Sequence, residues 1–446
     1  MKYFFLTAIC LLSLNAFAQE SYQLSVEEAV RYAIQNNPDL NKSRIDEQIV
    51  QEQIQEVKGR ALPQINGSAQ FTDNYSLAEQ QLPAEIVGGE PGTTIGVAFG
   101  NRYAVTAGVN VQQELLNFQL FNSVRAAKAL EELRSLQTLQ STEDLIINTV
   151  QIYVQVQITE KQVELLQENF NRTKSLVDLS DLKYEEGIIK KLDVNQLRVN
   201  LTNLETQIED AKYNRNEQLR LLKIYLNLPM ETELVLSEKL EERDPYPIMN
   251  ELILSSNIQY QQLQQQLELA EIDEYQVKAE YLPSLSAFFN YNYLGNTNEF
   301  QFSGAPYVDQ FNGTWGISAS IPIFDGFQRR NRLQQRELET KKLQEDQESL
   351  IKNIEKNYLD SKEQILLSQV QIENQNENME LAQENYDGIK LSYNEGVADL
   401  TELLDAEFAL RQAQSNYLNA LLQSRVAEVN LLRTSGQLSQ LITNPN

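Results

Sequence analysis

Residues 284–293 read Ser-Leu-Ser-Ala-Phe-Phe-Asn-Tyr-Asn-Tyr, so that every second residue from Leu285 to Tyr293 is apolar and the residues between them are polar, apart from Phe288. Alternation with a period of two predicts a β-strand with one apolar and one polar face. The same pattern occurs at residues 65–72, 103–112 and 315–323. Each stretch has about ten residues, which is the length of a tilted strand that crosses a bilayer.

A soluble β-sandwich is the alternative, because its core also receives the apolar face of alternating strands. The rest of the chain reads as long helices and offers no second sheet to cover that face, which favours a membrane. Four strands do not close a barrel, and an open edge in hydrocarbon leaves backbone groups unpaired. Closure must therefore be shared between chains, and a homotrimer with four strands from each chain would give a 12-stranded transmembrane β-barrel.

Two very long helices are predicted beside the strands. One runs from about Asn117 to the approach of Gly187 and the other from about Asp325 to the approach of Gly396, without an internal proline. Roughly 65 residues at 1.5 Å each give about 100 Å. Their apolar residues are sparse among Gln, Asn, Glu and Lys, as in a narrow coiled-coil seam with a wet opposite face. The expected fold is a mixed α+β membrane protein with a long antiparallel α-helical coiled-coil tunnel.

The chain contains the same frame twice. Residues 61–65 (Ala-Leu-Pro-Gln-Ile) match residues 281–285 (Tyr-Leu-Pro-Ser-Leu), and further matches follow at a slightly shorter offset. Each half reads helix, strand, loop, strand, very long helix, turn, helix. The expected organisation is a signal peptide at 1–18, a first repeat at 19–230, a linking segment at 231–248, a second repeat at 249–437 and a C-terminal tail at 438–446.

Local signals support this frame. Ser25 and Glu28 have the spacing of a capping box that opens the first helix. Pro63 and Pro283 are expected to close the leading helices, since proline cannot continue a helix. The segments at 75–102 and 294–313 are rich in turn residues and are predicted to be loops that face water.

The first residues predict export. Lys2, an apolar run over residues 3–14 and Ala-Phe-Ala at 16–18 have the order of a cleavable secretory signal, so the mature chain is expected to begin near Gln19. Cys10 is the only cysteine and lies inside that signal, which excludes disulfides from the mature chain. A net charge of −26 argues against nucleic acid as a partner.

The composition also argues against an enzyme. The chain has no histidine and no cysteine after the predicted signal. The common zinc sites, histidine-based triads and thiol nucleophiles are therefore absent, and no G-x-x-x-x-G-K-[ST] loop is present for phosphates. We expect no catalytic residue, no cofactor and no metal site.

Several short motifs together resemble one family. They are Ala-Ile-Gln-Asn-Asn-Pro-Asp-Leu at 33–40, Leu-Pro at 62–63, Ile-Pro-Ile-Phe-Asp-Gly at 321–326, and Tyr393 and Gly396 followed by Glu-Leu-Leu-Asp at 402–405. In this order, on a duplicated frame, the chain resembles the TolC-like outer membrane efflux proteins. The resemblance implies a homotrimeric, passive channel-tunnel in the outer membrane, with its helices in the periplasm, for export of small molecules or proteins. It also implies a periplasmic adaptor (a membrane fusion protein) and an inner-membrane pump as partners.

The candidate gate is a set of acidic residues near the second turn. Glu402 and Asp405 are three residues apart and share one face of the helix after Gly396. Three copies would form two stacked acidic rings, which attract cations and repel one another. Asp193 holds the repeat-equivalent position of Glu402. The alternative is an ordinary solvated acidic face, but the position implied by the resemblance favours the gate.

The turns themselves supply further candidates. Tyr184 and Tyr393 each precede a turn glycine by three residues, and they either hold the tip closed by hydrogen bonds or pack against the turn. Gly187 and Gly396 are expected to have positive φ and, by the resemblance, to face the adaptor. Ala398 stands where similar tunnels often carry a basic residue.

A different class of function is a coiled-coil surface adhesin or structural spacer. It would use the long helices but predicts neither alternating strands nor an acidic ring. The four strands therefore count against it.

Overall fold

The computed structural model describes residues 21–240, 252–300 and 308–438. The predicted signal peptide, Asp244–Pro247 of the linking segment and nearly all of the tail lie outside these ranges. The chain divides into two compact units, and each is described by itself. Unit 1 comprises Met1–Ile45, Ser135–Gln262 and Gln347–Asn446, and unit 2 comprises Asp46–Arg134 and Leu263–Asp346.

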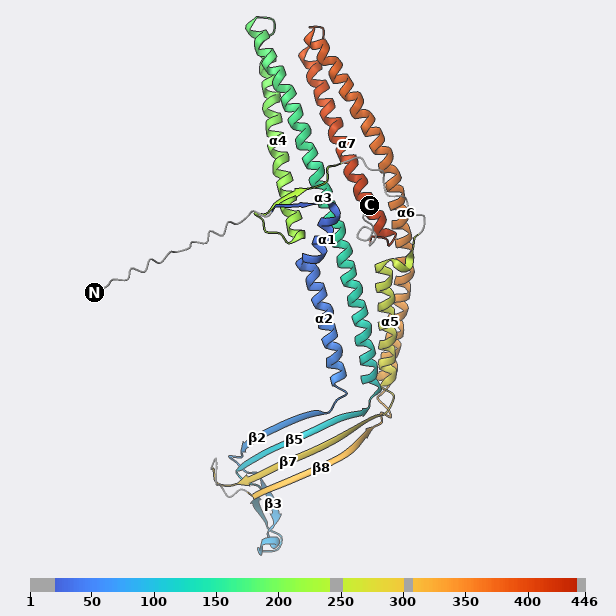
Figure 1. Cartoon of the computed structure of the whole chain (residues 1–446). Helices are drawn as coiled ribbons and strands as arrows, with labels where there is room; N and C mark the ends of the chain where they lie inside the picture. The colour runs from blue at the N-terminus through green and yellow to red at the C-terminus, as the bar shows by residue number, and fades with distance from the viewer. Residues whose placement is uncertain (1–20, 241–251, 301–307, 439–446) are drawn as a thin grey trace, which may run out of the picture. The chain divides into compact units, whose positions relative to one another are not determined.

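Seven α-helices follow one another in the described residues (Figure 1). Their bounds are α1 (Val26–Asn36), α2 (Pro38–Gly59), α3 (Phe118–Glu185), α4 (Lys191–Leu226), α5 (Ile258–Ala279), α6 (Gln328–Asn394) and α7 (Leu400–Thr434), with short 3₁₀ turns at Ala84–Val87 and Leu254–Ser256. The two long helices are confirmed as α3 and α6. None of the described helices has an apolar stretch long enough to cross a membrane.

Four antiparallel strands form the main sheet, which belongs to unit 2. In the order in which they pair, the strands are β2 (Gln64–Asp73), β5 (Tyr103–Leu116), β7 (Ser284–Thr297) and β8 (Val308–Ser320). The sheet is seen in Figure 1 with β2 and β8 at its edges. The four predicted strands are therefore confirmed, and β5, β7 and β8 are longer than the alternation alone had indicated.

The register brings the apolar residues of all four strands to one face. Ile65 pairs with Val111, Val111 with Phe289 and Phe289 with Trp315. Within the described residues most of this face is uncovered: Trp315 is 80% exposed and Ile65 is 68% exposed, and only near Tyr103 does Phe300 pack on it. An apolar face of this size has no place in water, so it needs a partner outside the chain.

The opposite face carries the polar residues. Asn66, Asn110, Asn290 and Thr314 stand in one row across the sheet, and Asn110 donates a hydrogen bond to Asn290. Phe288 is the apolar exception on this face. Its ring lies over Gly316, where a Cβ atom would come within 2.9 Å of it.

The boundaries predicted for the fourth strand were wrong. The alternation pointed to residues 315–323, but β8 begins earlier, at Val308, and ends at Ser320. Pro322 explains the early end, because proline has no N–H to donate to a ladder. The beginning was missed because Asp309 and Asn312 are residues typical of turns.

The segment at 75–102 was predicted to be a loop, yet it contains a hairpin. Strand β3 (Glu79–Pro83) pairs with β4 (Thr94–Ala98), and the 3₁₀ turn lies between them. Its Gly and Pro residues were interpreted only as loop signals. The hairpin has little apolar alternation because most of it is exposed.

A second small sheet joins distant parts of the sequence. Strand β1 (Ser21–Leu24) pairs in parallel with β6 (Glu233–Leu236), which lies in the segment predicted to link the halves. The start of the described chain is therefore held beside residues more than 200 positions away. A pairing of four residues over this separation leaves no local sequence signal.

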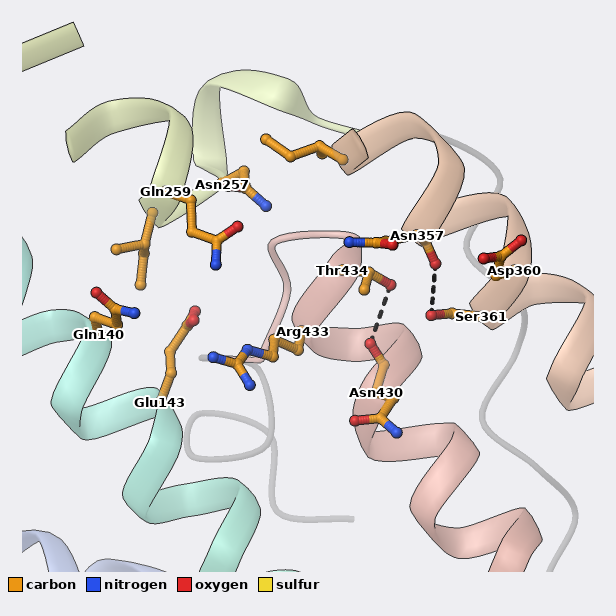
Figure 2. A pocket seen from close by; sticks show the side chains of 12 residues that line it. Gln140, Glu143, Asn257, Gln259, Asn357, Asp360, Ser361, Asn430, Arg433 and Thr434 are labelled. Carbon is orange, nitrogen blue, oxygen red and sulfur yellow. Dashed lines mark hydrogen bonds between the residues drawn. The ribbon is translucent and has the colours of Figure 1, made fainter. Parts of the chain in front are cut away.

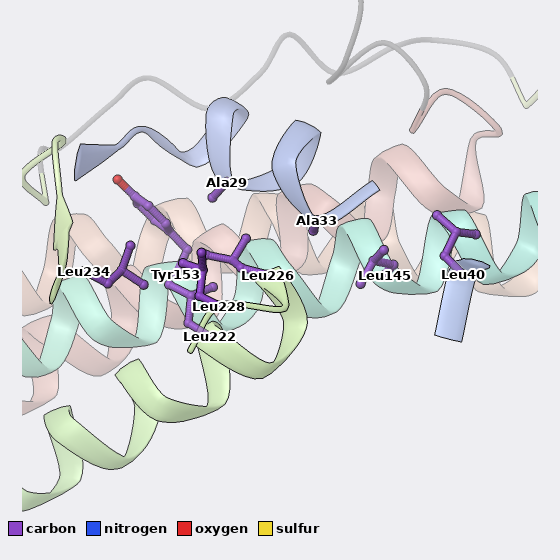
Figure 3. Packing of buried hydrophobic residues seen from close by; sticks show 9 residues of the cluster. All are labelled: Ala29, Ala33, Leu40, Leu145, Tyr153, Leu222, Leu226, Leu228 and Leu234. Carbon is purple, nitrogen blue, oxygen red and sulfur yellow. The ribbon is translucent and has the colours of Figure 1, made fainter. Parts of the chain in front are cut away.

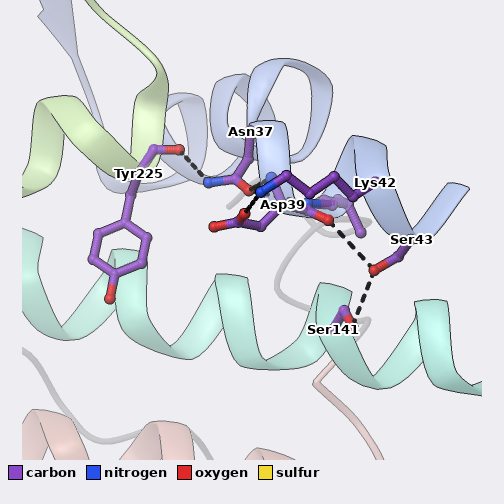
Figure 4. A network of polar contacts seen from close by, with 7 residues as sticks. Asn37, Asp39, Lys42, Ser43, Ser141 and Tyr225 are labelled. Atoms are coloured by element: carbon purple, nitrogen blue, oxygen red, sulfur yellow. Dashed lines mark hydrogen bonds and ion pairs between the residues drawn. The ribbon is translucent and has the colours of Figure 1, made fainter. Parts of the chain in front are cut away.

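The leading helix is broken into two at Asn37, where one helix had been expected. The Asn37 carboxamide oxygen accepts hydrogen bonds from the backbone N–H groups of Asp39 (2.9 Å) and Leu40 (3.1 Å), and so caps α2. Pro38 takes the first helical position, where its missing N–H costs nothing. The Asn37 side chain also donates to the Tyr225 carbonyl at the end of α4 (3.0 Å; Figure 4).

The core of unit 1 gathers around Tyr153 of α3. Its ring is 1% exposed, and its hydroxyl donates to the Leu24 carbonyl of β1 at 2.9 Å. Around it pack residues from α1, α4, the turn after α4, and β6 (Figure 3). The cluster comprises Ala29, Ala33, Leu40, Leu145, Tyr153, Leu222, Leu226, Leu228 and Leu234.

Candidate functional site at the helix turns

The turn between α3 and α4 is a glycine-terminated helix end. Gly187 has φ +77°. Its N–H donates to the Tyr184 carbonyl (2.9 Å), and the Ile188 N–H donates to the Lys183 carbonyl (2.8 Å). These two bonds make a Schellman motif, which satisfies carbonyls that the helix end leaves unpaired. A residue with a Cβ atom is strained at this φ, so glycine is required by the turn itself.

The turn between α6 and α7 repeats this geometry. Gly396 has φ +78°, its N–H donates to the Tyr393 carbonyl (3.1 Å), and the Val397 N–H donates to the Ser392 carbonyl (2.8 Å). The two turns are therefore equivalent in structure as well as in sequence. Whether an adaptor touches them stays a prediction.

The acidic candidates lie at the starts of the helices that follow these turns. Asp399 caps α7 by accepting the Glu402 N–H at 2.9 Å, and Glu402 and Asp405 are both exposed. Asp193 has the same third position in α4, but its carboxylate accepts the Lys190 N–H at 3.2 Å and is half-buried. Negative charge is favoured in the first turn of a helix, so each position has a local structural reason.

The two tyrosines differ in their surroundings. Tyr393 is 8% exposed, with the Lys183 ammonium of α3 5.2 Å from its ring centroid, whereas Tyr184 is 43% exposed. The Tyr393 hydroxyl is buried and has no hydrogen-bond partner within the described residues. In a single chain Tyr393 thus acts by packing and by its contact with Lys183, which is a link between the two hairpins.

An apolar cluster holds the four helices together near the turns. It contains residues from α3, α4, α6 and α7, with Leu197, Leu403 and Leu410 fully buried. Its members are Leu176, Val177, Leu197, Tyr386, Tyr393, Leu400, Leu403, Ala406 and Leu410. The hairpin α3–α4 and the hairpin α6–α7 are therefore packed against each other over several helical turns.

A buried carboxylate lies within this packing, and the sequence did not reveal it. Glu407 of α7 is 3% exposed. It accepts a hydrogen bond from the Thr173 hydroxyl of α3 (2.7 Å) and one from the Asn200 carboxamide of α4 (3.0 Å). The Asn169 side chain lies one turn from Thr173 on α3, and Gln414 lies two turns from Glu407 on α7. The Asn169 carboxamide donates a hydrogen bond to the Gln414 carboxamide oxygen (3.2 Å). These bonds all connect one hairpin to the other.

An aromatic and a cation complete this polar layer. Tyr386 is 1% exposed, and the Arg172 guanidinium lies 5.3 Å from its ring centroid. Burial, together with the nearby charge of Glu407, raises the pKa of Tyr386 to about 12, while Arg172 opposes the shift. A buried charge beside a buried hydroxyl is tolerated only where hydrogen bonds compensate its lost hydration.

The signal that could have found Glu407 was its place in the apolar pattern. Leu400, Leu403, Glu407 and Leu410 follow the alternating three- and four-residue spacing of a coiled-coil seam. A glutamate in that spacing points into the seam. In helices so rich in polar residues, this position had not been singled out.

Unit 1 also contains a polar cavity of about 400 Å³. Figure 2 shows the side chains of Glu143 and Arg433 directed into it. Arg433 also forms an ion pair with Asp144 (2.7 Å). Burial raises the pKa of Glu143 to about 7; Arg433 opposes this shift and Asp144 adds to it.

Glu143→Gln is expected to weaken the pH dependence of stability. The raised pKa means that Glu143 takes up a proton on folding, so its contribution is fully present below pH 4.5 and is lost as pH rises through about 7. Because the side chain is partly solvated, we expect this pH-dependent contribution to the free energy of unfolding to be roughly 1 kcal/mol. Thermal melting at pH 5 and pH 8 measures it, with exposed Glu205→Gln as control. An unchanged pH slope in Glu143→Gln would contradict the assignment.

A four-stranded sheet with an uncovered apolar face, joined to paired helical hairpins, defines a class of channel-forming proteins of the outer membrane. The chain belongs to the outer membrane efflux protein family, which it matches over residues 29–228 and 250–437. It is therefore a channel protein of an efflux or secretion system, located in the outer membrane with its helical part in the periplasm. The adhesin alternative is not supported.

Individual relatives are distant. The outer membrane protein TolC of Escherichia coli is 22% identical over 442 residues, covering 96% of this chain and 85% of TolC. The solved structure of CusC has a TM-score of 0.72 at 18% identity and covers 93% of this chain and 92% of CusC. The Campylobacter jejuni CmeC outer membrane channel has a TM-score of 0.72 at 19% identity, with coverage of 93% and 86%.

Proposed function

We propose that three copies of this chain form a passive export duct, with β2, β5, β7 and β8 of each copy in one twelve-stranded transmembrane barrel. The main sheet carries the proposal, because its apolar face is uncovered and its edge strands have one neighbour each among the described residues. In a four-stranded antiparallel sheet the two edge strands run in opposite directions. The β8 strand of one copy can therefore pair antiparallel with β2 of the next, and a ring of copies removes both edges.

The helices would form the periplasmic part of the duct. Small molecules or proteins would enter it from the side of the inner membrane. A periplasmic adaptor and an inner-membrane pump would supply substrate choice and energy, and the Gly187 and Gly396 turns would face the adaptor. We assign residues 19–230 and 249–437 to two structural repeats and residues 231–248 to the segment between them. The matching turns at both glycines support this division.

Glu402 and Asp405, with Asp193, would line the constriction at the turn end. Both α7 carboxylates are exposed, and neither forms an ion pair within the described residues. Three copies would bring these charges around one axis, where their repulsion favours opening until a cation or a partner neutralises them. The buried contacts of Glu407 and Tyr393 with the other hairpin would oppose that opening.

Conductance in a planar bilayer tests the duct. The wild-type protein is expected to give small, cation-selective channels. Glu402→Ala/Asp405→Ala is expected to lower the cation conductance about twofold or more and to reduce the selectivity, because fixed negative charge concentrates cations and its repulsion favours opening. Glu373→Ala/Glu377→Ala removes two exposed carboxylates from α6 and is the matched control. No channels from correctly inserted wild-type protein would refute the duct. Equal effects of both double variants would refute the gate alone.

A further inference from the structure

We propose that the junction between β8 and α6 binds an anionic phospholipid, with Arg330 holding the phosphate and Phe324 and Phe327 lying among the acyl chains. The inference rests on the proposed function, in which the main sheet crosses a membrane. It adds a lipid site at the end of that sheet. All the residues concerned belong to unit 2.

The apolar half of the site follows directly from the end of β8. Ile323 is 93% exposed and Phe324 is 71% exposed, and both lie directly after Ser320, where the strand ends. The rings of Phe324 and Phe327 meet edge to face, with centroids 5.3 Å apart. Large apolar side chains at the end of a membrane strand are typical of the interface between lipid and water.

The backbone holds Phe327 in an unfavourable conformation. Its φ is +64°, directly after Gly326 at +68°. The left-handed region disfavours residues with a Cβ atom, and bulky ones in particular. Within the described residues Phe327 gains little burial in return, since its side chain is 58% exposed. A contact outside the chain, such as acyl chains, would compensate for this strain.

The polar half of the site is a run of arginines. Residues 321–336 contain four arginines and one acid, Asp325, in a chain whose net charge is −26. Arg329 is 6% exposed and stabilises the junction by three contacts. It forms an ion pair with Asp325 (2.7 Å) and donates a hydrogen bond to the Glu280 carbonyl (2.9 Å). Its guanidinium lies 4.8 Å from the ring centroid of Tyr281. It is therefore structural, and it fixes the arginines that follow.

Arg330 remains for a ligand. Arg332 lies two residues further along α6 and on another side of the helix, where it forms an ion pair with Glu280 (2.6 Å) and lines a cavity of about 380 Å³. Arg330 is exposed and has no ion-pair partner in the part of the chain that the structure describes.

The combination selects an anionic phospholipid. A guanidinium fits phosphate oxygens in a bidentate manner and loses less hydration than an ammonium. Inorganic phosphate would pair with Arg330 but leave Phe324 and Phe327 in water. A lipid satisfies both halves, and its position at the helix end of the sheet matches the leaflet that faces the periplasm.

Native mass spectrometry of the detergent-solubilised full-length protein tests the site, with phosphatidylglycerol as the probe. Arg330→Gln is expected to raise the dissociation constant about tenfold, as for loss of one charge-assisted contact. Lys341→Gln, which removes an exposed positive charge about three turns further along the same helix, is expected to change it less than twofold. Excess inorganic phosphate should not displace the lipid.

Three results would overturn the lipid site. One is equal phosphatidylglycerol binding by wild type and Arg330→Gln, and another is an equal loss in Lys341→Gln, which would mean diffuse charge attraction. The third is that Phe327→Ser breaks the trimer in the same spectra without weakening lipid binding, which would make this face a contact between copies. Bilayer conductance of the same samples separates this failure from failure of the duct, because the channel is expected to stay open in Arg330→Gln.

Discussion

Glu407→Ala is expected to lower the free energy of unfolding of the paired hairpins by about 3 kcal/mol. The truncation removes the acceptor of both the Thr173 hydroxyl and the Asn200 carboxamide, and it leaves these donors in a site where Glu407 is only 3% exposed. Thermal loss of the helical circular dichroism signal measures the change. Hydrogen exchange near the turns should also rise, since the two hairpins separate more easily.

Two variants make this result specific. Glu205→Ala removes an exposed glutamate of α4 and is expected to change the stability by less than about 0.5 kcal/mol. Glu407→Gln keeps an acceptor oxygen and the side-chain volume, so it should cost about 1 kcal/mol. If Glu407→Ala melts like Glu205→Ala, the buried carboxylate does not join the hairpins.

Cysteine pairs across the sheet edges should produce a covalently closed trimer. Ser68→Cys in β2 is combined in turn with Asn312→Cys, Thr314→Cys or Ser318→Cys in β8, all on the polar face by register. The mature chain is expected to have no cysteine of its own, so any disulfide reports the engineered pair. A disulfide forms only where the Cα atoms come within about 7 Å, so one combination should give a band at three times the monomer mass.

Asn110→Cys/Asn290→Cys is the matched control for this experiment. These residues pair within one chain, so their disulfide should leave the monomer mass unchanged. Oxidised β2/β8 variants that stop at covalent dimers, or that never cross-link in membranes, would argue against ring closure by three copies.

The long elements could be predicted because each repeats one physical signal many times. Helices α3 and α6 have no internal proline over 68 and 67 residues, and the main sheet shows alternation on all four strands. Short or distant features could not. The β1–β6 pair has four residues on each strand, and the break at Asn37 depends on a side-chain cap.

The candidate site was predictable only in part. The φ values of Gly187 and Gly396 follow from the need for a left-handed residue after a helix. Glu407 was missed because a buried and a solvated glutamate have the same appearance in a helix rich in Gln, Asn and Glu, and only its spacing from Leu403 and Leu410 distinguishes them. How Glu402 and Asp405 face other copies depends on chains beyond this one.

The β1–β6 pair constrains the order in which the polypeptide can fold after export. A secreted chain emerges with its N-terminus first, and Ser21–Leu24 must then wait until Glu233–Leu236 has followed. The closure spans about half of the chain, and closing a long loop is entropically costly and slows folding. During that interval Ala29 and Ala33 also lack Leu222 and Leu226, against which they pack. The first part of the chain to emerge therefore carries an exposed apolar stripe, which a holding chaperone would be expected to bind until residues 222–236 have followed.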